Sequence, residues 1–246
     1  MGGFTMFLLL SGEGASDIGI QNDELGPMTK FVDNWIERRS GYSLIDNNYY
    51  IIVTKARLVE LVKELRESKE FKTLSKVGKK NKRETAYFHN NARALAILAE
   101  RESVSRGTEI IPILFRDGDG TASSGRGQCE DKRLSMLAGF EAGGVSNGVP
   151  MIPKPKSEAW ILCALRNKYQ NCERIENESG NDDSPNSLKH QLKECLGEKA
   201  TRVLLNHQID EGNLDIKKIV DMPSLTAFKD RLDEVLDNLR LPRELV

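Results

Sequence analysis

The first apolar stretch of the chain and the loop after it read FTMFLLLSGEGASD over residues 4–17. The run that ends at Leu10 is almost continuously apolar and too short for a typical helix, as expected of a strand covered on both faces. Glycines on both sides of Glu13 allow a sharp turn after this strand, and Asp17 follows about one helical turn later. We therefore expect a central parallel strand whose carboxyl end leads into a loop with two acidic side chains.

Strand-like and helix-like patterns alternate along the chain from this first strand onward. Short runs rich in apolar residues follow at 49–54, 108–115 and 149–152. Apolar residues at helical spacing occupy 28–38, 58–65, 84–102 and 130–142, and a further helix begins near Ser157. Such alternation predicts an α/β fold with a Rossmann-like parallel sheet flanked by helices.

The organisation of the chain changes after a polar segment at 173–186. An apolar stripe at helical spacing then runs from Leu225 to Leu239. We predict an α/β catalytic domain over residues 1–170 and a small helical appendage over residues 187–246 that packs on it.

Composition narrows the class of protein. The 246 residues carry a net charge of −1, so a site for a polyanion must be a local patch rather than a property of the whole surface. The four cysteines show neither C-x-x-C spacing nor a zinc-ligand pattern, which favours free thiols in a reducing compartment. With neither a signal peptide nor a membrane anchor in the sequence, we expect a cytoplasmic protein.

A second pair of acidic residues follows a later strand. Asp117 and Asp119 stand two positions apart, so in an extended backbone they point the same way. Ligands of open parallel sheets bind beyond the carboxyl ends of the strands, where Glu13 and Asp17 are also expected. Carboxylates about 4 Å apart repel one another by roughly 4 kcal/mol per pair at an effective dielectric of about 20, so the cluster needs a cation. Oxygen ligands alone favour Mg²⁺, with Mn²⁺ or Ca²⁺ next.

The same motifs resemble the TOPRIM fold of topoisomerases, bacterial-type primases and OLD-family nucleases. Gly12-Glu13-Gly14 after a strand, and Asp117-Gly118-Asp119 ending a later one, are similar to the acidic motifs of that family. The resemblance implies that Asp17, Asp117 and Asp119 hold metal and that Glu13 holds metal or transfers protons. Glu158, in the sequence PKSEAW, is similar to the acid that some of these nucleases use for a second metal. Thr121 stands where many members carry a third acid, so one and two metals both stay open.

Basic residues near these acids are candidates for phosphate contact. A lysine-rich stretch at 69–83 contains the residues expected to hold a polynucleotide backbone, namely Lys76, Lys79, Lys80, Lys82 and Arg83. Lys154 and Lys156 precede Glu158 and are candidates to stabilise a charged transition state. Solvated surface lysines would show the same pattern.

The primary hypothesis is a Mg²⁺-dependent nuclease, or a related phosphodiester-processing enzyme, that acts on DNA or RNA. The layout of residues 11–19, the Gly26-Pro27 pair and the block SEAW at 157–160 resemble small stand-alone bacterial proteins of the TOPRIM type, and this resemblance implies a link to phage defence. One alternative is a non-catalytic nucleic-acid or nucleotide sensor, which would work through a separate partner such as the ATPase that OLD-type nucleases carry in their own chain. A second alternative is a phosphatase of the haloacid-dehalogenase type, because residues 117–121 read DGDGT. Asp117 would then be a covalent nucleophile.

Overall fold

The sheet of this protein is parallel throughout the part of the chain that the structure describes. The structure is a computed structural model and describes residues 6–68, 85–118, 128–166, 171–219 and 221–239. Four strands pair in the order β2-β1-β3-β4. Their bounds are β1 (Met6–Ser11), β2 (Tyr50–Val53), β3 (Glu109–Phe115) and β4 (Val149–Met151). The expected α/β class with a helix-flanked parallel sheet is confirmed.

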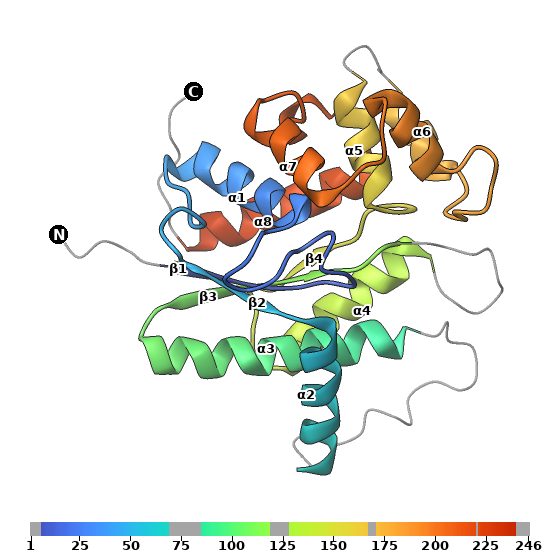
Figure 1. The fold of residues 1–246 in the computed structure, drawn as a ribbon. Helices are drawn as coiled ribbons and strands as arrows, with labels where there is room; N and C mark the ends of the chain where they lie inside the picture. Colours follow the sequence, from blue (N-terminus) through green and yellow to red (C-terminus); the bar gives the residue numbers. More distant parts are fainter. Residues whose placement is uncertain (1–5, 69–84, 119–127, 167–170, 220, 240–246) are drawn as a thin grey trace.

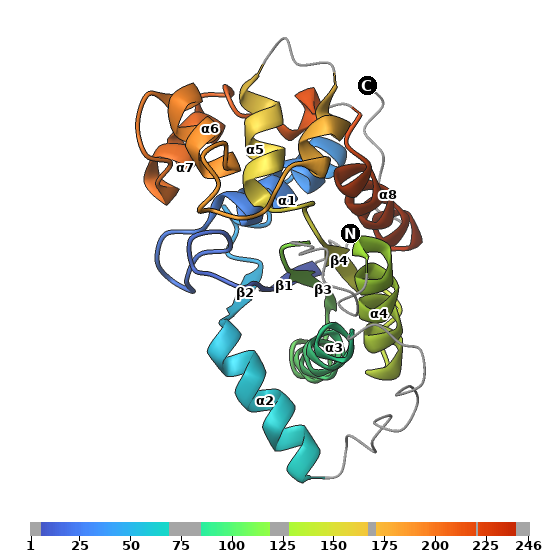
Figure 2. The same cartoon turned by 90° about the vertical axis from the view of Figure 1, so that its right-hand side faces the viewer.

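Helices cover both faces of the sheet (Figures 1 and 2). One face carries α2 (Lys55–Glu67), α3 (Ala86–Arg106) and α4 (Cys129–Ala142). The other carries α1 (Pro27–Ser40), α5 (Ser157–Leu165), η1 (Cys172–Asn177), α6 (Leu188–Leu196), α7 (Arg202–Asp210), η2 (Ile216–Lys218) and α8 (Pro223–Asn238). Leu8 and Leu10 of β1 pack into the core under the second face, whereas Leu9 packs into the core under the first. The continuous apolar run of β1 follows from this burial on both sides.

The register of the strands brings two loops to the same edge of the sheet. Ser11, the last residue of β1, pairs with Leu114 near the end of β3. Because the two strands are parallel neighbours, the residues that follow them leave the sheet side by side. The loops that contain Glu13 and Asp117 therefore begin next to one another.

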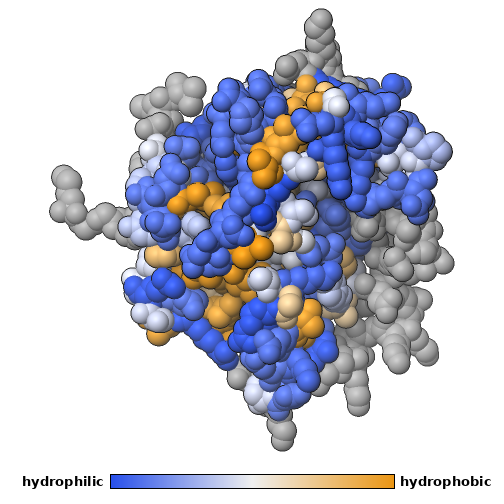
Figure 3. Space-filling model, in the orientation of Figure 1, coloured by the Kyte–Doolittle hydropathy of each residue, from blue (hydrophilic) through white to orange (hydrophobic). Residues whose placement is uncertain are grey.

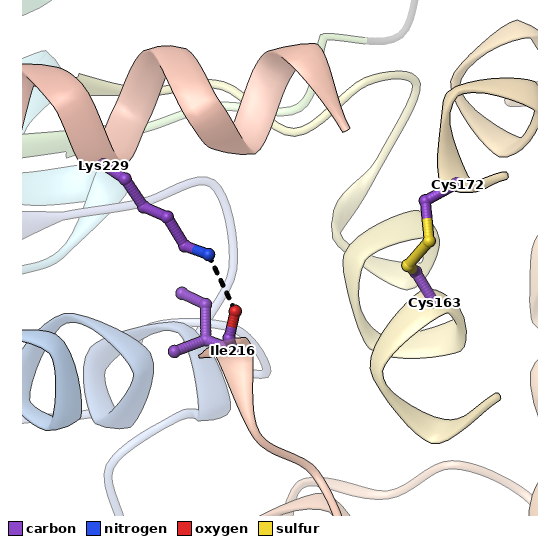
Figure 4. Close-up of a disulfide and its surroundings, with 4 residues drawn as sticks. All are labelled: Cys163, Cys172, Ile216 and Lys229. Carbon is purple, nitrogen blue, oxygen red and sulfur yellow. Dashed lines mark hydrogen bonds between the residues drawn. A yellow bond between two sulfur atoms is a disulfide. The ribbon is translucent and has the colours of Figure 1, made fainter. Parts of the chain in front are cut away.

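The C-terminal helices share the core of the α/β region. Leu205 of α7 and Leu232 of α8 are buried in the same cluster as Phe31 of α1 and Trp160 of α5. Within α8, Lys229 donates a hydrogen bond from Nζ to the carbonyl oxygen of Ile216 at 2.8 Å, which fastens the 3₁₀ turn η2 to the helix (Figure 4). The helices after residue 187 thus share one continuous hydrophobic core with α1 and α5.

The prediction of four free thiols is wrong. Cys163 of α5 and Cys172 of η1 form a disulfide with a Cα–Cα separation of 5.8 Å, whereas Cys129 and Cys195 are free (Figure 4). The two half-cystines are nine positions apart, and the packing of η1 against the end of α5 brings them together. No short cysteine motif could have signalled this pair.

The surface is mostly hydrophilic in the view of Figure 3, with hydrophobic patches near the middle of this face and among the helices at its top. Across the described residues, we find no helix with the length and apolar character needed to cross a membrane.

Candidate active site

Three separate segments meet at the first residue of α5. The hydroxyl of Ser157 donates a hydrogen bond to Oδ1 of Asp17 at 2.8 Å, and its backbone N–H donates to Oδ1 of Asp117 at 3.1 Å. The same hydroxyl lies 3.5 Å from Oε2 of Glu158. The carboxylates of Asp17, Asp117 and Glu158 therefore converge on one buried serine. We call these three residues the acidic cluster.

The loop after β1 is held in place by the start of α1. The backbone N–H groups of Asp17 and Ile18 both bond to the carbonyl oxygen of Gly14, which closes a tight turn. The carbonyl oxygen of Asp17 in turn accepts from the N–H of Met28 at 2.9 Å. A Cβ atom at Gly26 would lie 2.1 Å from that same oxygen, so only glycine permits this approach. The backbone of Asp17 is therefore fixed by packing.

The segment after β3 is fixed by the chain that follows β4. The backbone N–H of Gly118 donates to the carbonyl oxygen of Pro153 at 2.7 Å, and the Gly118 carbonyl accepts from Nζ of Lys132 at 2.9 Å. A Cβ atom at Gly118 would lie 2.7 Å from the Pro153 oxygen. The turn that presents Asp117 thus requires the glycine that follows it.

Burial and mutual repulsion dominate the electrostatics of the site. Burial and the negative charges of Asp17, Glu158 and Glu13 together raise the pKa of Asp117 to about 8, against the opposing hydrogen bond from the backbone N–H of Ser157. Burial also raises the pKa of Glu158, although Lys189 opposes the shift. Full ionisation of the cluster is therefore unfavourable unless positive charge comes close.

The donor set fits a hard divalent cation. Its side-chain donors are carboxylate oxygens, and such a cation would lower the pKa of Asp117 by favouring the ionised form. In the described part of the chain, however, no three acidic, histidine or cysteine side chains are already arranged as ligands of one ion. Asp119, the remaining expected ligand, lies outside the described residues.

Glu13 faces a buried arginine that the sequence analysis did not select. Its Oε1 lies 3.9 Å from Nε of Arg116, whose side chain is fully buried. Nη1 of Arg116 donates to the carbonyl oxygen of Phe115 at 2.7 Å, and the guanidinium carbon lies 5.7 Å from the ring centre of Tyr87. Nε and Nη2 have no hydrogen-bond partner among the described residues. The only signal in the sequence was the position of Arg116 directly before Asp117.

The two expected lysines after β4 take different directions. Nζ of Lys156 lies 3.1 Å from Oδ1 of Asp182, and its charge opposes the rise in the pKa of Glu158. Nζ of Lys154 instead donates to Oδ1 of Asn177 at 3.3 Å. Of the two candidates, Lys156 is thus the one whose charge acts on a member of the acidic cluster.

Lys189 of α6 is a second cation that the sequence analysis missed. Its Nζ lies 2.5 Å from Oδ2 of Asp182 and 4.0 Å from Oε1 of Glu158. No sequence motif indicates Lys189, because it lies near the site only through the packing of α6 against α5. The lysine-rich stretch with Lys76, Lys79, Lys80, Lys82 and Arg83 lies outside the described residues.

Comparison with known proteins yields no relative. No protein-family model, curated protein or solved structure matches the chain significantly.

Proposed function

We propose that the protein is a TOPRIM-like, Mg²⁺-dependent nuclease or a related phosphodiester-processing enzyme, with Mn²⁺ as an alternative ion. The observation that carries this proposal is the convergence of Asp17, Asp117 and Glu158 on Ser157 at the carboxyl edge of a parallel sheet. Enzymes that cleave phosphodiesters commonly hold divalent cations with such carboxylates. The order of the acidic motifs along the chain agrees with the TOPRIM resemblance.

We assign metal binding and proton transfer to different acidic residues of the site according to their surroundings. Asp17 and Asp117, together with Asp119, are the proposed metal ligands, and Glu158 is a weaker further member. Mg²⁺ bound there would polarise a phosphoryl oxygen and make a bound water more acidic. Glu13 is 36% exposed and can accept a proton from an attacking water, and Nε of Arg116 lies 3.9 Å from its carboxylate.

Ser157 orients the metal ligands and takes no part in the reaction itself. Its hydroxyl and its backbone N–H each hold one carboxylate, so Asp17 and Asp117 cannot rotate independently of α5. Hydrogen bonds of this kind behind metal ligands commonly set both affinity and geometry.

The proposed substrate is DNA or RNA, bound through a local cationic rim on a nearly neutral protein. Lys156 and Lys189 supply positive charge beside the acidic cluster. Lys156 is the proposed stabiliser of charge that develops on phosphate during cleavage.

Cleavage assays test the proposal directly. Labelled single- and double-stranded DNA and RNA would be incubated with Mg²⁺ or Mn²⁺ and the wild type, an Asp117→Ala, Asp119→Ala double variant, or an Asp23→Asn control. Asp23 is an exposed acid outside the cluster. We expect metal-dependent cleavage by the wild type and the control, and loss of cleavage in the double variant at unchanged fold.

Other outcomes identify the alternatives. Binding of polynucleotide and Mg²⁺ without turnover would favour a sensor that acts through a partner protein. Release of phosphate from small phosphomonoesters would favour the phosphatase. Cleavage that survives in the double variant would show that the acidic cluster is not the active site.

A further inference from the structure

Two lysines from different segments, Lys156 and Lys189, form ion pairs with the carboxylate of Asp182 beside the acidic cluster. Oδ1 of Asp182 lies 3.1 Å from Nζ of Lys156, and Oδ2 lies 2.5 Å from Nζ of Lys189. The Lys156 side chain is only 15% exposed, so it is held by packing as well as by charge. Two ammonium groups arranged around two oxygens of one anion would suit a phosphate group equally well.

This pair of lysines borders the proposed active site. Lys156 directly precedes Ser157, and Nζ of Lys189 lies 4.0 Å from Oε1 of Glu158. The cations therefore stand beside carboxylates that we assign to metal binding. A phosphodiester chain carries one negative charge per phosphate, so a phosphate held by the two lysines would lie directly beside the acidic cluster.

We propose that Lys156 and Lys189 form a subsite for a phosphate group of a polynucleotide, and that Asp182 fills this subsite until the phosphate displaces it. The inference rests on the proposed function, because the adjacent acidic cluster makes a phosphodiester the expected ligand. It adds a binding subsite and an internal competitor that the sequence motifs did not indicate.

The surroundings of Asp182 permit such displacement. Its side chain is 43% exposed and belongs to the polar loop between η1 and α6. Local contacts shape that loop, such as the bond from the N–H of Asp183 to Oδ1 of Asn181 at 3.1 Å. Lys189 is 56% exposed as well, and an ion pair between two such exposed side chains contributes little to stability, so its exchange for a contact with another anion costs the fold little.

Binding measurements on the full chain test the subsite without any need for turnover. Labelled DNA and RNA oligonucleotides would be titrated in EDTA at low salt, with fluorescence anisotropy as the readout. The variants are Asp182→Asn and the matched control Asp183→Asn, which removes the same charge one position away. We expect Asp182→Asn to tighten binding about two- to fivefold more than the control, which is the range that exposed ion pairs supply.

A second set of variants assigns the gain to the two lysines. Adding Lys156→Gln or Lys189→Gln to Asp182→Asn should abolish the gain, whereas adding Lys199→Gln, at an exposed lysine in the loop after α6, should not. Inorganic phosphate should compete with the oligonucleotide more effectively in Asp182→Asn than in Asp183→Asn.

Several results would overturn the inference. Equal affinities of Asp182→Asn and Asp183→Asn would do so, as would a gain that survives loss of either lysine. Tighter binding of inorganic phosphate without tighter binding of polynucleotide would refute the assigned ligand. A confirmed gain in affinity combined with failed cleavage assays would keep the subsite and refute the nuclease, so the two failures are distinguishable.

Discussion

The hydroxyl of Ser157 donates a hydrogen bond to Asp17 across 140 positions of sequence, at 2.8 Å. This bond ties the loop after the first strand to the first turn of α5. The backbone N–H of the same serine binds Asp117, so a single residue sets the distance between two proposed metal ligands. The geometry of the site therefore depends on where α5 begins.

Replacement of Ser157 by alanine should impair metal-dependent activity while the protein stays folded. The change removes the bond to Asp17 but keeps the backbone N–H that binds Asp117. We expect roughly a 10- to 100-fold loss of Mg²⁺ affinity or cleavage, as for other residues that orient metal ligands. Calorimetry with Mg²⁺ and cleavage rates would measure it, with the exposed Ser105→Ala as control. Unchanged Mg²⁺ affinity in Ser157→Ala would contradict the assigned role.

The raised pKa of Asp117 should make stability depend on pH when divalent cations are absent. The pKa is about 8 in the folded protein, against an ordinary value of 3.8 for an aspartate, so the folded state binds an additional proton between these values. The free energy of unfolding should therefore fall as pH rises from about 4 to about 8, by at most about 1.4 kcal/mol per pH unit. Urea unfolding in EDTA at several pH values would measure this slope. Asp117→Asn should flatten it, and an equal slope in that variant would exclude Asp117 as its source.

Arg116 and Glu13 should be energetically coupled. Arg116→Met removes the buried guanidinium that lies 3.9 Å from Glu13, so the carboxylate loses its nearest described cation. We expect cleavage to fall about tenfold or more in Arg116→Met and in Glu13→Gln, with a double variant scarcely worse than either single one. Rates for the double-mutant cycle would test this, with Arg66→Met at an exposed helical position as control. Strictly additive losses would mean that the two residues act independently.

The C-terminal helices should unfold together with the sheet. Leu232 of α8 is fully buried in the cluster that also contains Phe31 of α1. Leu232→Ala should lower the free energy of unfolding by about 2–5 kcal/mol and shift the whole transition, because it leaves a cavity in a shared core. Val203→Ala, at a position that is 65% exposed, should have little effect. Separate transitions for helix content and for tryptophan fluorescence would show that the C-terminal helices are an independent unit.

The strands can be predicted from local sequence because burial on both faces makes each of them a short run of apolar residues. β1 and β3 are apolar along almost their whole length, since both faces of a parallel sheet are covered. The acidic residues could be predicted as well, because Glu13 and Asp117 each stand two positions after the end of one of these strands. The carboxyl ends of neighbouring parallel strands lie at the same edge of the sheet.

Sequence reasoning missed Lys189, Asp182 and the disulfide for one physical cause. Lys189 and Asp182 belong to the polar loop and helix after η1, where local composition indicates only a solvated surface. The disulfide between Cys163 and Cys172 likewise depends on how η1 packs against α5. These contacts form between separate secondary-structure elements, so they cannot be predicted from the spacing of residues within one element.

The sequence by itself determined the class of fold and the acidic residues at the strand ends, because hydrophobic periodicity and strand direction are properties of single elements. Tertiary structure alone settled which side chains meet. It placed Ser157 between Asp17 and Asp117, turned Arg116 towards Glu13, and brought Lys189 beside Glu158. The packing of helices on the sheet and the free-energy cost of burying charges without partners select these pairings. Both act only in the folded chain, because they depend on residues that are far apart in the sequence.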